Sequence, residues 1–226
     1  KTTAHKLWGN KASILVGDYL YAIAFKKIAM LEQQKWIQTL ADTTLVIVHG
    51  ELQQWQDRTQ VVDETTYESI IAAKTAALFS LTTALPAMMT QQPNHIEQAL
   101  KHFGHHIGMA YQLKDDLLDY NGDTAQLGKS VGDDYMEGKA TLPFIYTLTQ
   151  ASTKEAQWMK KALKNKDASA FTGVCDLIKK HNGNQYTADK MNKHIELAHD
   201  AIKPIARFAA DPYIKSLLNY LTIREA

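Results

Sequence analysis

The sequence predicts an all-α protein, and three observations favour that fold class. Apolar residues recur at the three- and four-residue spacing of an amphipathic helix along most of the 226-residue chain. Eleven glycines and five prolines are few for this length, which argues against a turn-rich all-β fold. Hydrophobic residues make up 45% of the sequence, enough to fill a sizeable core. We therefore expect one domain of many helices over residues 1–226.

The first half of the chain carries the periodicity of long helices. Three of them are expected over residues 11–31, 36–57 and 67–85. The third should stop at Pro86, because proline has no backbone N–H to donate. Asn94, with Glu97 three residues later, has the spacing of a capping box, so a further helix should begin there. It should run to about Tyr120 and end at the Asn121-Gly122 pair.

The second half contains one segment of different composition, residues 122–138. Four glycines alternate there with charged side chains, so we expect a mobile polar loop between helices. Long loops inside compact domains are more often functional than idle. The helices expected after it are shorter, over residues 139–150, 153–164, 168–181, 185–210 and 211–224.

Charge and cysteine content exclude several classes of protein. Twenty-five basic and 24 acidic residues leave a formal net charge of +1, so nothing favours binding to nucleic acid or to an anionic membrane. The single cysteine, Cys175, excludes an internal disulfide framework and is typical of a reducing compartment. The most apolar stretch, residues 12–31, is interrupted by three charged side chains, so no membrane-spanning segment is predicted. We expect a soluble, cytoplasmic protein.

Three aspartates, Asp115, Asp116 and Asp119, form the clearest chemical signal. In a helix they share one face, where like charges repel by roughly 0.2–0.5 kcal/mol per pair. A cation would remove the repulsion, and carboxylate oxygens suit Mg²⁺, which usually also bridges to substrate phosphates. The same pattern is that of a solvated acidic helix face, and the residues alone leave both interpretations open.

Upstream in the same predicted helix, Gly104, Gly108 and Gln112 fall on the stripe of the aspartates. Glycine in a helix interior costs roughly 1 kcal/mol relative to alanine, so these two glycines need a reason. Close packing against another helix is one interpretation. Clearance for a ligand below a metal ion is the other.

Three lysines stand beside other unusual features. Lys74 lies on a helix rich in small residues, and Lys129 and Lys139 accompany the glycine-rich segment. Each lysine taken singly is an ordinary surface residue. Together with the aspartates, they could surround a diphosphate and stabilise the charge that develops on a leaving group.

Asp18 interrupts an apolar helix, and Ala22, Phe25 and Ala29 lie below it on the same stripe. An apolar groove headed by a carboxylate would suit an apolar chain whose anionic head is held through a metal. We expect these three residues to line a tunnel that limits product length. A helix-bundle core with one hydrogen-bonded aspartate would give the same pattern.

Taken together, these motifs resemble the trans-type polyprenyl diphosphate synthases, especially their bacterial octaprenyl branch. The motifs keep the family's order and spacing from the first residues to beyond Pro143. The matching segments are GNKASILVGDYLY (9–21), GELQQ (50–54), KTA (74–76), QLKDDLLDY (112–120), GKSVGDD (128–134) and EGKATLP (137–143).

The resemblance implies the isoprenoid synthase fold, a multi-helix bundle around a central cavity, in a homodimer. It implies a prenyltransferase that joins isopentenyl diphosphate to an allylic diphosphate, head to tail (1′-4). Up to three Mg²⁺ ions would bridge the allylic diphosphate to two Asp-rich motifs. The octaprenyl branch implies a long all-trans product that feeds quinone side chains.

The resemblance also implies roles for single residues. The three aspartates would form the second Asp-rich motif, with Asp115 the most direct ligand to Mg²⁺. The three lysines would hold the allylic diphosphate. Thr75 and Gln112 would steady the allylic end and the carbocation, and Asp133 would extend the polar network near Lys129.

The family's first Asp-rich motif, and the basic residues that bind isopentenyl diphosphate, would lie upstream of Gly9, and the 226 residues do not contain them. We therefore expect the domain to be incomplete at its N-terminus. We also expect residues 1–226 by themselves to have negligible synthase activity.

Three other functions stay open. A farnesyl or geranylgeranyl synthase would carry the same motifs with a shorter product. A terpene cyclase would ionise a similar substrate without isopentenyl diphosphate, although the three lysines favour the prenyltransferase. A non-catalytic partner subunit should carry a degraded Asp-rich motif, whereas all three aspartates are present here.

Overall fold

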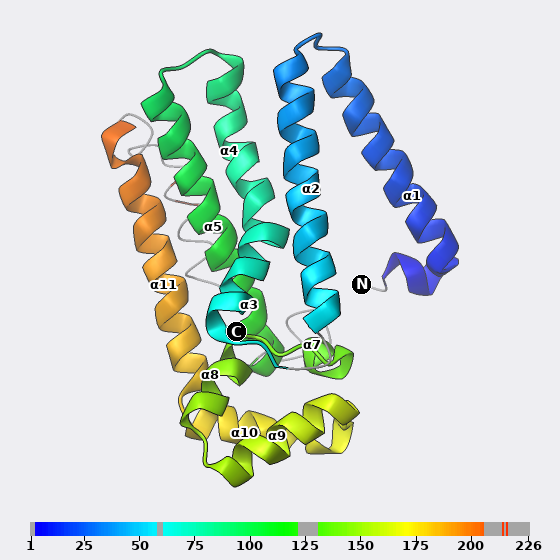
Figure 1. The fold of residues 1–226 in the computed structure, drawn as a ribbon, viewed down its shortest axis with the longest axis vertical. Coiled ribbons are helices and arrows are strands. Elements are labelled where there is room, and N and C mark those ends of the chain that lie inside the picture. Colours follow the sequence, from blue (N-terminus) through cyan, green and yellow to red (C-terminus); the bar gives the residue numbers. More distant parts are fainter. Residues whose placement is uncertain (1–2, 58–60, 122–130, 206–213, 215, 217–226) are drawn as a thin grey trace. The chain divides into compact units, whose positions relative to one another are not determined.

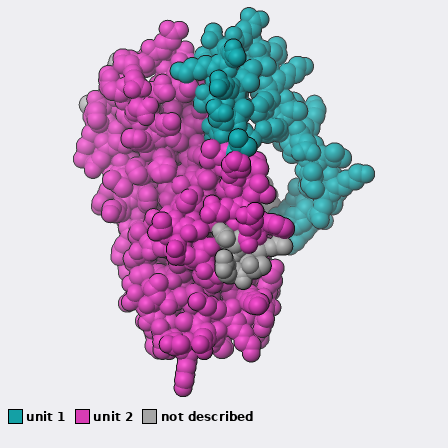
Figure 2. Space-filling model, viewed as in Figure 1, with its two compact units in different colours: residues 1–45 teal, residues 46–226 magenta. Residues whose placement is uncertain are grey.

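A computed structural model of the chain describes residues 3–57, 61–121, 131–205, 214 and 216. Across these ranges every regular element is a helix, as Figure 1 shows, and the prediction of an all-α fold is confirmed. The chain divides into two compact units, residues 1–45 and residues 46–226 (Figure 2). The expectation of one domain over the whole chain remains a prediction.

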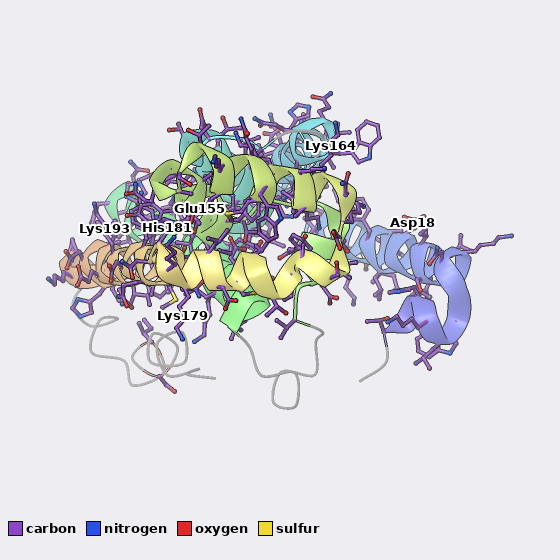
Figure 3. All side chains as sticks on the ribbon, turned by 90° about the horizontal axis from the view of Figure 1, so that it is seen from below. Asp18, Glu155, Lys164, Lys179, His181 and Lys193 are labelled. Carbon is purple, nitrogen blue, oxygen red and sulfur yellow. The ribbon has the colours of Figure 1, made fainter. Side chains whose placement is uncertain are left out.

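The first unit contains α1 (Ala4–Ala29) and the beginning of α2 (Gln34–Asp57), which continues into the second unit. α1 begins seven residues earlier than the periodicity predicts and is kinked at Gly9, whose φ is +80°. The structure describes all residues of α1, and none of their side chains is buried. Asp18 lies on this helix (Figure 3).

In the second unit, three helical elements follow one another without a break. They are α3 (Glu64–Ile71), the π-helical turn η1 (Ala72–Ala76) and α4 (Ala77–Met89). The start of α3 is capped by Asp63, whose carboxylate accepts a hydrogen bond from the Thr66 N–H at 2.8 Å. A π-helical turn inside an α-helix is uncommon and often marks a functional position.

The expectation that this helix stops at Pro86 is wrong, because Pro86 lies inside α4. The φ angle of proline is itself helical, and only three helical residues follow Pro86 before the cap. The Pro86 carbonyl accepts from the Thr90 N–H at 3.0 Å, so the last turn closes normally.

Within the described residues, one continuous helical stretch, Glu64–Met89, is long and apolar enough to cross a membrane by those two criteria alone. The stretch packs against α5 and buries Tyr67, Ile71 and Ala76.

α5 (Asn94–Asn121) is the long helix that the others pack around in the second unit (Figure 1). It begins one residue earlier than the capping-box spacing predicts. The Pro93 carbonyl already accepts from the Ile96 N–H at 2.9 Å. The Asn94 side chain instead accepts from the Gln98 amide at 3.4 Å.

The two glycines of α5 lie where other helices approach closely. A Cβ atom on Gly104 would lie 2.5 Å from the Phe79 carbonyl oxygen, and one on Gly108 would lie 2.5 Å from the Ala76 Cα. Both distances are below those that real Cβ atoms show. The glycines therefore let α5 pack directly against η1 and α4, which favours the packing interpretation over clearance for a ligand.

The later elements are shorter: α7 (Asp133–Glu137), α8 (Leu142–Gln150), α9 (Thr153–Asn165), η2 (Ala168–Ala170), α10 (Phe171–Lys180), α11 (Gly183–Ile202) and η3 (Lys203–Ile205). The short helix α7 was not predicted within the glycine-rich segment, whose residues 122–130 lie outside the described residues. Three helices are shorter than expected: α8 begins at Leu142 rather than Lys139, α10 covers Phe171–Lys180 rather than 168–181, and α11 ends at Ile202, two residues before Pro204. Of the helix expected over 211–224, only residues 214 and 216 are described.

The start of α9 forms the reciprocal capping box that the sequence pattern Ser-x-x-Glu favours. Ser152 accepts from the Glu155 backbone N–H, and Glu155 accepts from the Ser152 backbone N–H. The Glu155 carboxylate also accepts from Lys180 Nζ at 2.6 Å and lies 3.5 Å from His181 Nε2 (Figure 3). These contacts hold α9 against the end of α10.

Two clusters of buried side chains form the core of the second unit. The larger lies where α5 packs on α3, α4, α8 and α11, and includes Ile71, Ile107 and Ile202. The smaller lies between α7, α8, α9 and α10, and includes Tyr135 and Phe144. The larger cluster supports the C-terminal half of α5, which carries the aspartates.

Candidate active site

The three aspartates lie in the last turns of α5 but in different environments. Asp116 is fully buried, Asp119 is 2% exposed, and Asp115 is half-buried. They therefore do not share one solvent-facing surface. The difference arises because α3, α7 and α8 cover part of the helix circumference that the sequence pattern treats as a single face.

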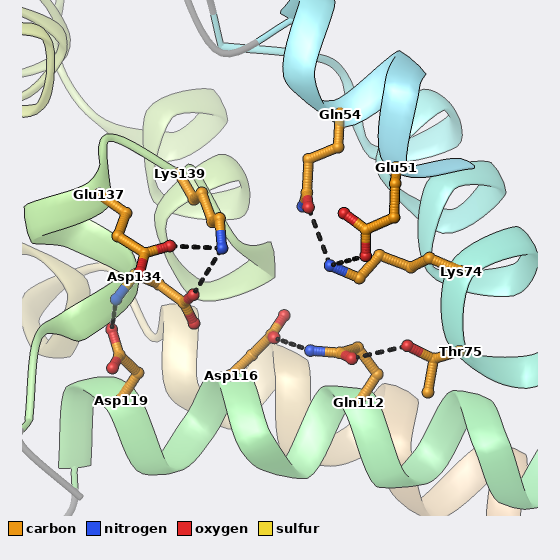
Figure 4. Close-up of polar contacts among 10 residues, drawn as sticks. All are labelled: Glu51, Gln54, Lys74, Thr75, Gln112, Asp116, Asp119, Asp134, Glu137 and Lys139. Carbon is orange, nitrogen blue, oxygen red and sulfur yellow. Dashed lines mark hydrogen bonds and ion pairs between the residues drawn. The ribbon is translucent and has the colours of Figure 1, made fainter. Parts of the chain in front are cut away.

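A chain of hydrogen bonds ends on Asp116. The Thr75 hydroxyl donates to Gln112 Oε1 at 2.9 Å, and Gln112 Nε2 donates to Asp116 Oδ1 at 3.1 Å (Figure 4). The buried Tyr67 hydroxyl donates to the other carboxylate oxygen, Asp116 Oδ2. Tyr67 was not among the predicted site residues, because in the sequence it looks like any aromatic residue of a core helix.

Burial shifts the pKa values of Asp116 and Tyr67. Loss of solvent raises the pKa of Asp116 to about 7, although the hydrogen bonds from Tyr67 and Gln112 act in the opposite direction. Burial also raises the pKa of Tyr67 well above its usual value, and the Asp116 charge adds to that effect. Tyr67 is therefore always the donor at neutral pH.

Asp119 connects α5 to α7. Its side-chain Oδ2 accepts from the Asp134 backbone N–H at 3.2 Å (Figure 4), and its backbone carbonyl accepts from the Gly132 N–H at 3.0 Å. Asp133, the first residue of α7, is half-buried. Its predicted neighbour Lys129 lies outside the described residues.

Lys74 projects from the π-helical turn toward α2. Its Nζ donates to Gln54 Oε1 at 2.8 Å and lies 3.4 Å from Glu51 Oε1 (Figure 4). The side chain is 17% exposed. Gly50 allows this approach, because a Cβ there would lie 3.0 Å from the Lys74 backbone nitrogen. The GELQQ motif and Lys74 are thus parts of one contact.

Lys139 follows α7 and is held by acidic residues of that helix. Its Nζ lies 2.5 Å from Glu137 Oε2 and 3.9 Å from Asp134 Oδ1 (Figure 4). Burial lowers the pKa of Lys139, but the hydrogen bond from Lys139 to Glu137 and the negative charges of Glu137, Asp134 and Glu51 outweigh burial, so the pKa lies above its usual value. The lysine stays positive at neutral pH.

A pocket of about 360 Å³ lies between the partners of the two lysines. Residues of α2 line one side of it and residues around α7 line the other. Its lining is Glu51, Gln54, Trp55, Met136, Glu137, Lys139 and Lys166. Lys166 was not predicted, since a lysine at the end of an exposed helix carries no distinguishing signal in the sequence.

Within residues 3–57, 61–121 and 131–205, no group of three or more His, Cys, Asp or Glu side chains is placed to hold a metal ion by itself. Asp116 uses both carboxylate oxygens for hydrogen bonds, and Asp119 accepts from α7. Asp115 is the most exposed of the three. A donor set of one or two carboxylates fits Mg²⁺, which keeps several waters and completes its shell with substrate phosphates.

The predicted tunnel residues lie in the first unit. Ala22 and Ala29 are exposed on α1, and Phe25 is half-buried, with its ring centroid 4.7 Å from that of Tyr21. The structure describes them within residues 1–45 only, so their role in limiting product length stays a prediction.

Comparison with known proteins identifies the family. Residues 1–179 match the family model of polyprenyl synthetases. The chain is 35% identical over 205 residues to the octaprenyl diphosphate synthase of Haemophilus influenzae. That alignment covers 90% of the chain and 62% of the relative. It is 30% identical over 233 residues to the geranylgeranyl diphosphate synthase of Saccharolobus solfataricus, covering 96% of the chain and 69% of the relative. The chain thus spans less than two thirds of the length of the Haemophilus protein.

The fold agrees with solved structures. A polyprenyl synthase from Caulobacter crescentus, crystallised with calcium and isoprenyl diphosphate, superposes with a TM-score of 0.91 at 32% identity. The alignment covers 100% of this chain and 70% of that one. The predicted isoprenoid synthase fold is therefore confirmed, and the chain belongs to the polyprenyl synthetase family.

Proposed function

We propose that this protein is a Mg²⁺-dependent prenyltransferase that condenses isopentenyl diphosphate with an allylic diphosphate, head to tail. The observation that carries the proposal is the placing of two lysines. Lys74 and Lys139 come from elements 65 residues apart, yet their side-chain partners line the same pocket. Lys139 lines the pocket and Lys74 contacts Glu51 and Gln54 on its other side, an arrangement that suits a ligand with two phosphate groups.

The lysines are held by side chains that a diphosphate could replace. Glu137 contacts Lys139, and Glu51 with Gln54 contacts Lys74. A diphosphate carries more charge than either carboxylate, so it would take over both lysines. We include Lys129 as a third cation of this site and Asp133 as its polar neighbour, on the family's pattern.

The metal would be held chiefly by Asp115, with the other two aspartates of the motif, Asp116 and Asp119, beside it. When bound with the diphosphate, Mg²⁺ would supply positive charge that stabilises the departing group. The protein's own part is to present Lys74 and Lys139 to the same group.

In the proposed reaction, the C1–O bond of the allylic diphosphate breaks and its electron pair leaves with the diphosphate. The double bond of isopentenyl diphosphate then forms the new bond from its C4 to that C1. Loss of a C2 proton to the released diphosphate restores a double bond. The Thr75 hydroxyl oxygen and the Gln112 amide oxygen would face the electron-poor carbon.

The product is proposed to be long and all-trans, of the octaprenyl class, and to serve a quinone side chain. The similarity to an octaprenyl synthase supports a long product, and the similarity to a geranylgeranyl synthase supports a shorter one as second candidate. Ala22, Phe25 and Ala29 are the proposed tunnel residues, and Phe25→Ala should lengthen the product if they act so. A homodimer in the cytoplasm is proposed on the family's pattern.

The test is incorporation of radiolabelled isopentenyl diphosphate by the natural protein and by residues 1–226, with an allylic primer and Mg²⁺. Chain lengths are read by chromatography of the dephosphorylated products. We expect incorporation by the natural protein and negligible incorporation by residues 1–226 alone. Conversion of the allylic substrate without incorporation would instead support a cyclase.

A further inference from the structure

We propose that Asp116 is an internal anchor for Gln112 and Thr75 and does not bind metal, and that Tyr67 is the positioning residue that holds this anchor. The proposal deepens the prenyltransferase function and rests on it for its catalytic consequences. It divides the Asp-rich motif into one aspartate that binds the ion, Asp115, and one that organises the neighbouring side chains.

The first argument is accessibility. Asp116 is 0% exposed and Tyr67 is 3% exposed. Both Asp116 oxygens already accept hydrogen bonds, Oδ2 from Tyr67 and Oδ1 from Gln112. Because the Asp116 side chain is fully buried, a metal ion could contact it only if the packing around it opened, which would disturb the hydrogen bond from the buried Tyr67 hydroxyl. Asp115, one residue earlier on α5, is half-buried, so its carboxylate is more accessible than that of Asp116.

The second argument is the direction of the hydrogen bonds. Tyr67 and Gln112 both donate to Asp116, and Thr75 donates to Gln112. When it is ionised, the Asp116 carboxylate can only accept, and in that state it sets the direction of the hydrogen bonds that lead to it from Thr75 through Gln112. The Thr75 proton therefore points at Gln112, which leaves the lone pairs of the Thr75 oxygen for an electron-poor carbon.

The third argument is geometric. Tyr67 and Thr75 stand eight residues apart on the stretch formed by α3 and η1, and their partners Asp116 and Gln112 stand four apart on α5. Two cross-links at separate levels fix both the height and the rotation of the π-helical turn relative to α5. Lys74 precedes Thr75, so the same cross-links aim Lys74 at α2.

The decisive experiment compares Asp115→Asn with Asp116→Asn in the natural protein. Titration calorimetry measures how binding of inorganic pyrophosphate depends on Mg²⁺ concentration. Loss of a ligand in Asp115→Asn should raise the Mg²⁺ concentration for half-maximal binding by about tenfold or more. Asp116→Asn should leave that Mg²⁺ concentration within about twofold of the wild-type value. An asparagine can keep the series of hydrogen bonds if the side-chain amide of Gln112 flips. Equal shifts in the two variants would overturn the anchor.

The catalytic arm compares Tyr67→Phe with Tyr186→Phe. Both tyrosines donate to a carboxylate, since the Tyr186 hydroxyl lies 2.8 Å from Glu64 Oε1. Tyr186 lies on α11 and takes no part in the hydrogen bonds that lead to Asp116. Tyr67→Phe should lower kcat by about tenfold with KM for the allylic substrate nearly unchanged, as expected when only an interaction of the transition state weakens. Tyr186→Phe should keep kcat. Equal kcat in the two variants would overturn the positioning role.

Two further results keep the tests separable. If Tyr67→Phe does not fold, Asp116→Asn replaces it: the flipped amide of Gln112 reverses its hydrogen bond with Thr75, so kcat should fall although the Mg²⁺ dependence is kept, and an unchanged kcat would overturn the anchor. If the wild-type protein incorporates no isopentenyl diphosphate, the proposed function fails. The calorimetric comparison still decides whether Asp116 binds the ion.

Discussion

At the scale of single residues, Lys139 lies between two acidic side chains. This pairing explains how a positive charge is held at the pocket. Glu137 contacts the lysine at 2.5 Å and Asp134 at 3.9 Å. Exposed ion pairs of this kind contribute little to stability, because water and salt screen them. Their main effect is to hold the ammonium group at the pocket until a more highly charged anion arrives.

The first prediction concerns Lys139→Ala. It should raise KM for the allylic diphosphate by about 10- to 100-fold, which corresponds to the ~1.5–3 kcal/mol of a hydrogen bond to a charged group. Steady-state kinetics of the natural protein measure it. Lys164→Ala, on the exposed surface of α9, is the matched control and should leave KM unchanged. The same KM in both variants would remove Lys139 from the binding site.

At the scale of elements, α5 and α11 are joined by a pair of histidines. His106 Nδ1 and His194 Nδ1 lie 3.0 Å apart, so one neutral ring donates to the other. Burial lowers the pKa of each histidine to about 4, and the positive charges around them act in the same direction. The groups that face the pair are His102 and His105 on α5 and Lys190 and Lys193 on α11.

The second prediction is that this pair makes the second unit sensitive to acid. The unfolded histidines titrate near a pKa of about 6.5 and the folded ones near 4, so the unfolded chain binds more protons between these pH values. The free energy of unfolding should therefore fall as the pH drops from about 6.5 toward 4. Urea unfolding at pH 7 and pH 5 measures it.

The control for the acid prediction is a variant that removes the pair. His106→Asn combined with His194→Asn should flatten the dependence on pH. His95→Asn, an exposed histidine at the start of α5, should keep the wild-type slope. An unchanged slope in the double variant would show that other groups cause the acid sensitivity.

The third prediction tests the close packing of α5 on the π-helical turn. Gly108→Ala places a methyl group 2.5 Å from the Ala76 Cα and should destabilise the protein by about 1–3 kcal/mol, the usual cost of overpacking. Gly17→Ala is the opposite case, because nothing lies within 4 Å of its added Cβ, and it should stabilise α1 by about 0.5–1 kcal/mol. Equal stability of the two variants, by urea unfolding, would contradict the packing.

At the scale of the whole molecule, the formal net charge of +1 hides a separation of charge. The aspartates lie at the end of α5, whereas Lys74 and Lys139 lie on the elements that face it in the second unit. Such a separation does not attract polyanions in general. It favours a small ligand that brings both a cation and phosphate groups.

The fourth prediction follows from that separation. Mg²⁺ and inorganic pyrophosphate added together should stabilise the folded protein by about 2.7 kcal/mol at a ligand concentration one hundred times the Kd. Pyrophosphate with a chelator should give a much smaller effect, because the aspartates then repel the anion. Thermal unfolding of the natural protein measures both. Equal stabilisation with and without Mg²⁺ would count against a shared metal.

Features that depend on neighbouring residues were predictable from the sequence. The all-α class and the spans of α2 and α9 follow from periodicity, capping and composition, which act within a few residues. The resemblance to the family extended this to the residues proposed to bind the diphosphate. The boundary at Pro86 was missed by three residues, because the φ angle of proline is itself helical, and the start of α5 was missed by one residue.

Only the tertiary structure decided which aspartate is buried. Tyr67 and Asp116 are 49 residues apart in the chain, and no local pattern indicates that they meet. The same holds for the π-helical turn that carries Lys74, which Gly50 of α2 and Gly108 of α5 approach closely from distant parts of the chain. Periodicity states which side chains share a face of a helix. It does not state which part of that face another helix covers, and that covering separates Asp116 from Asp115.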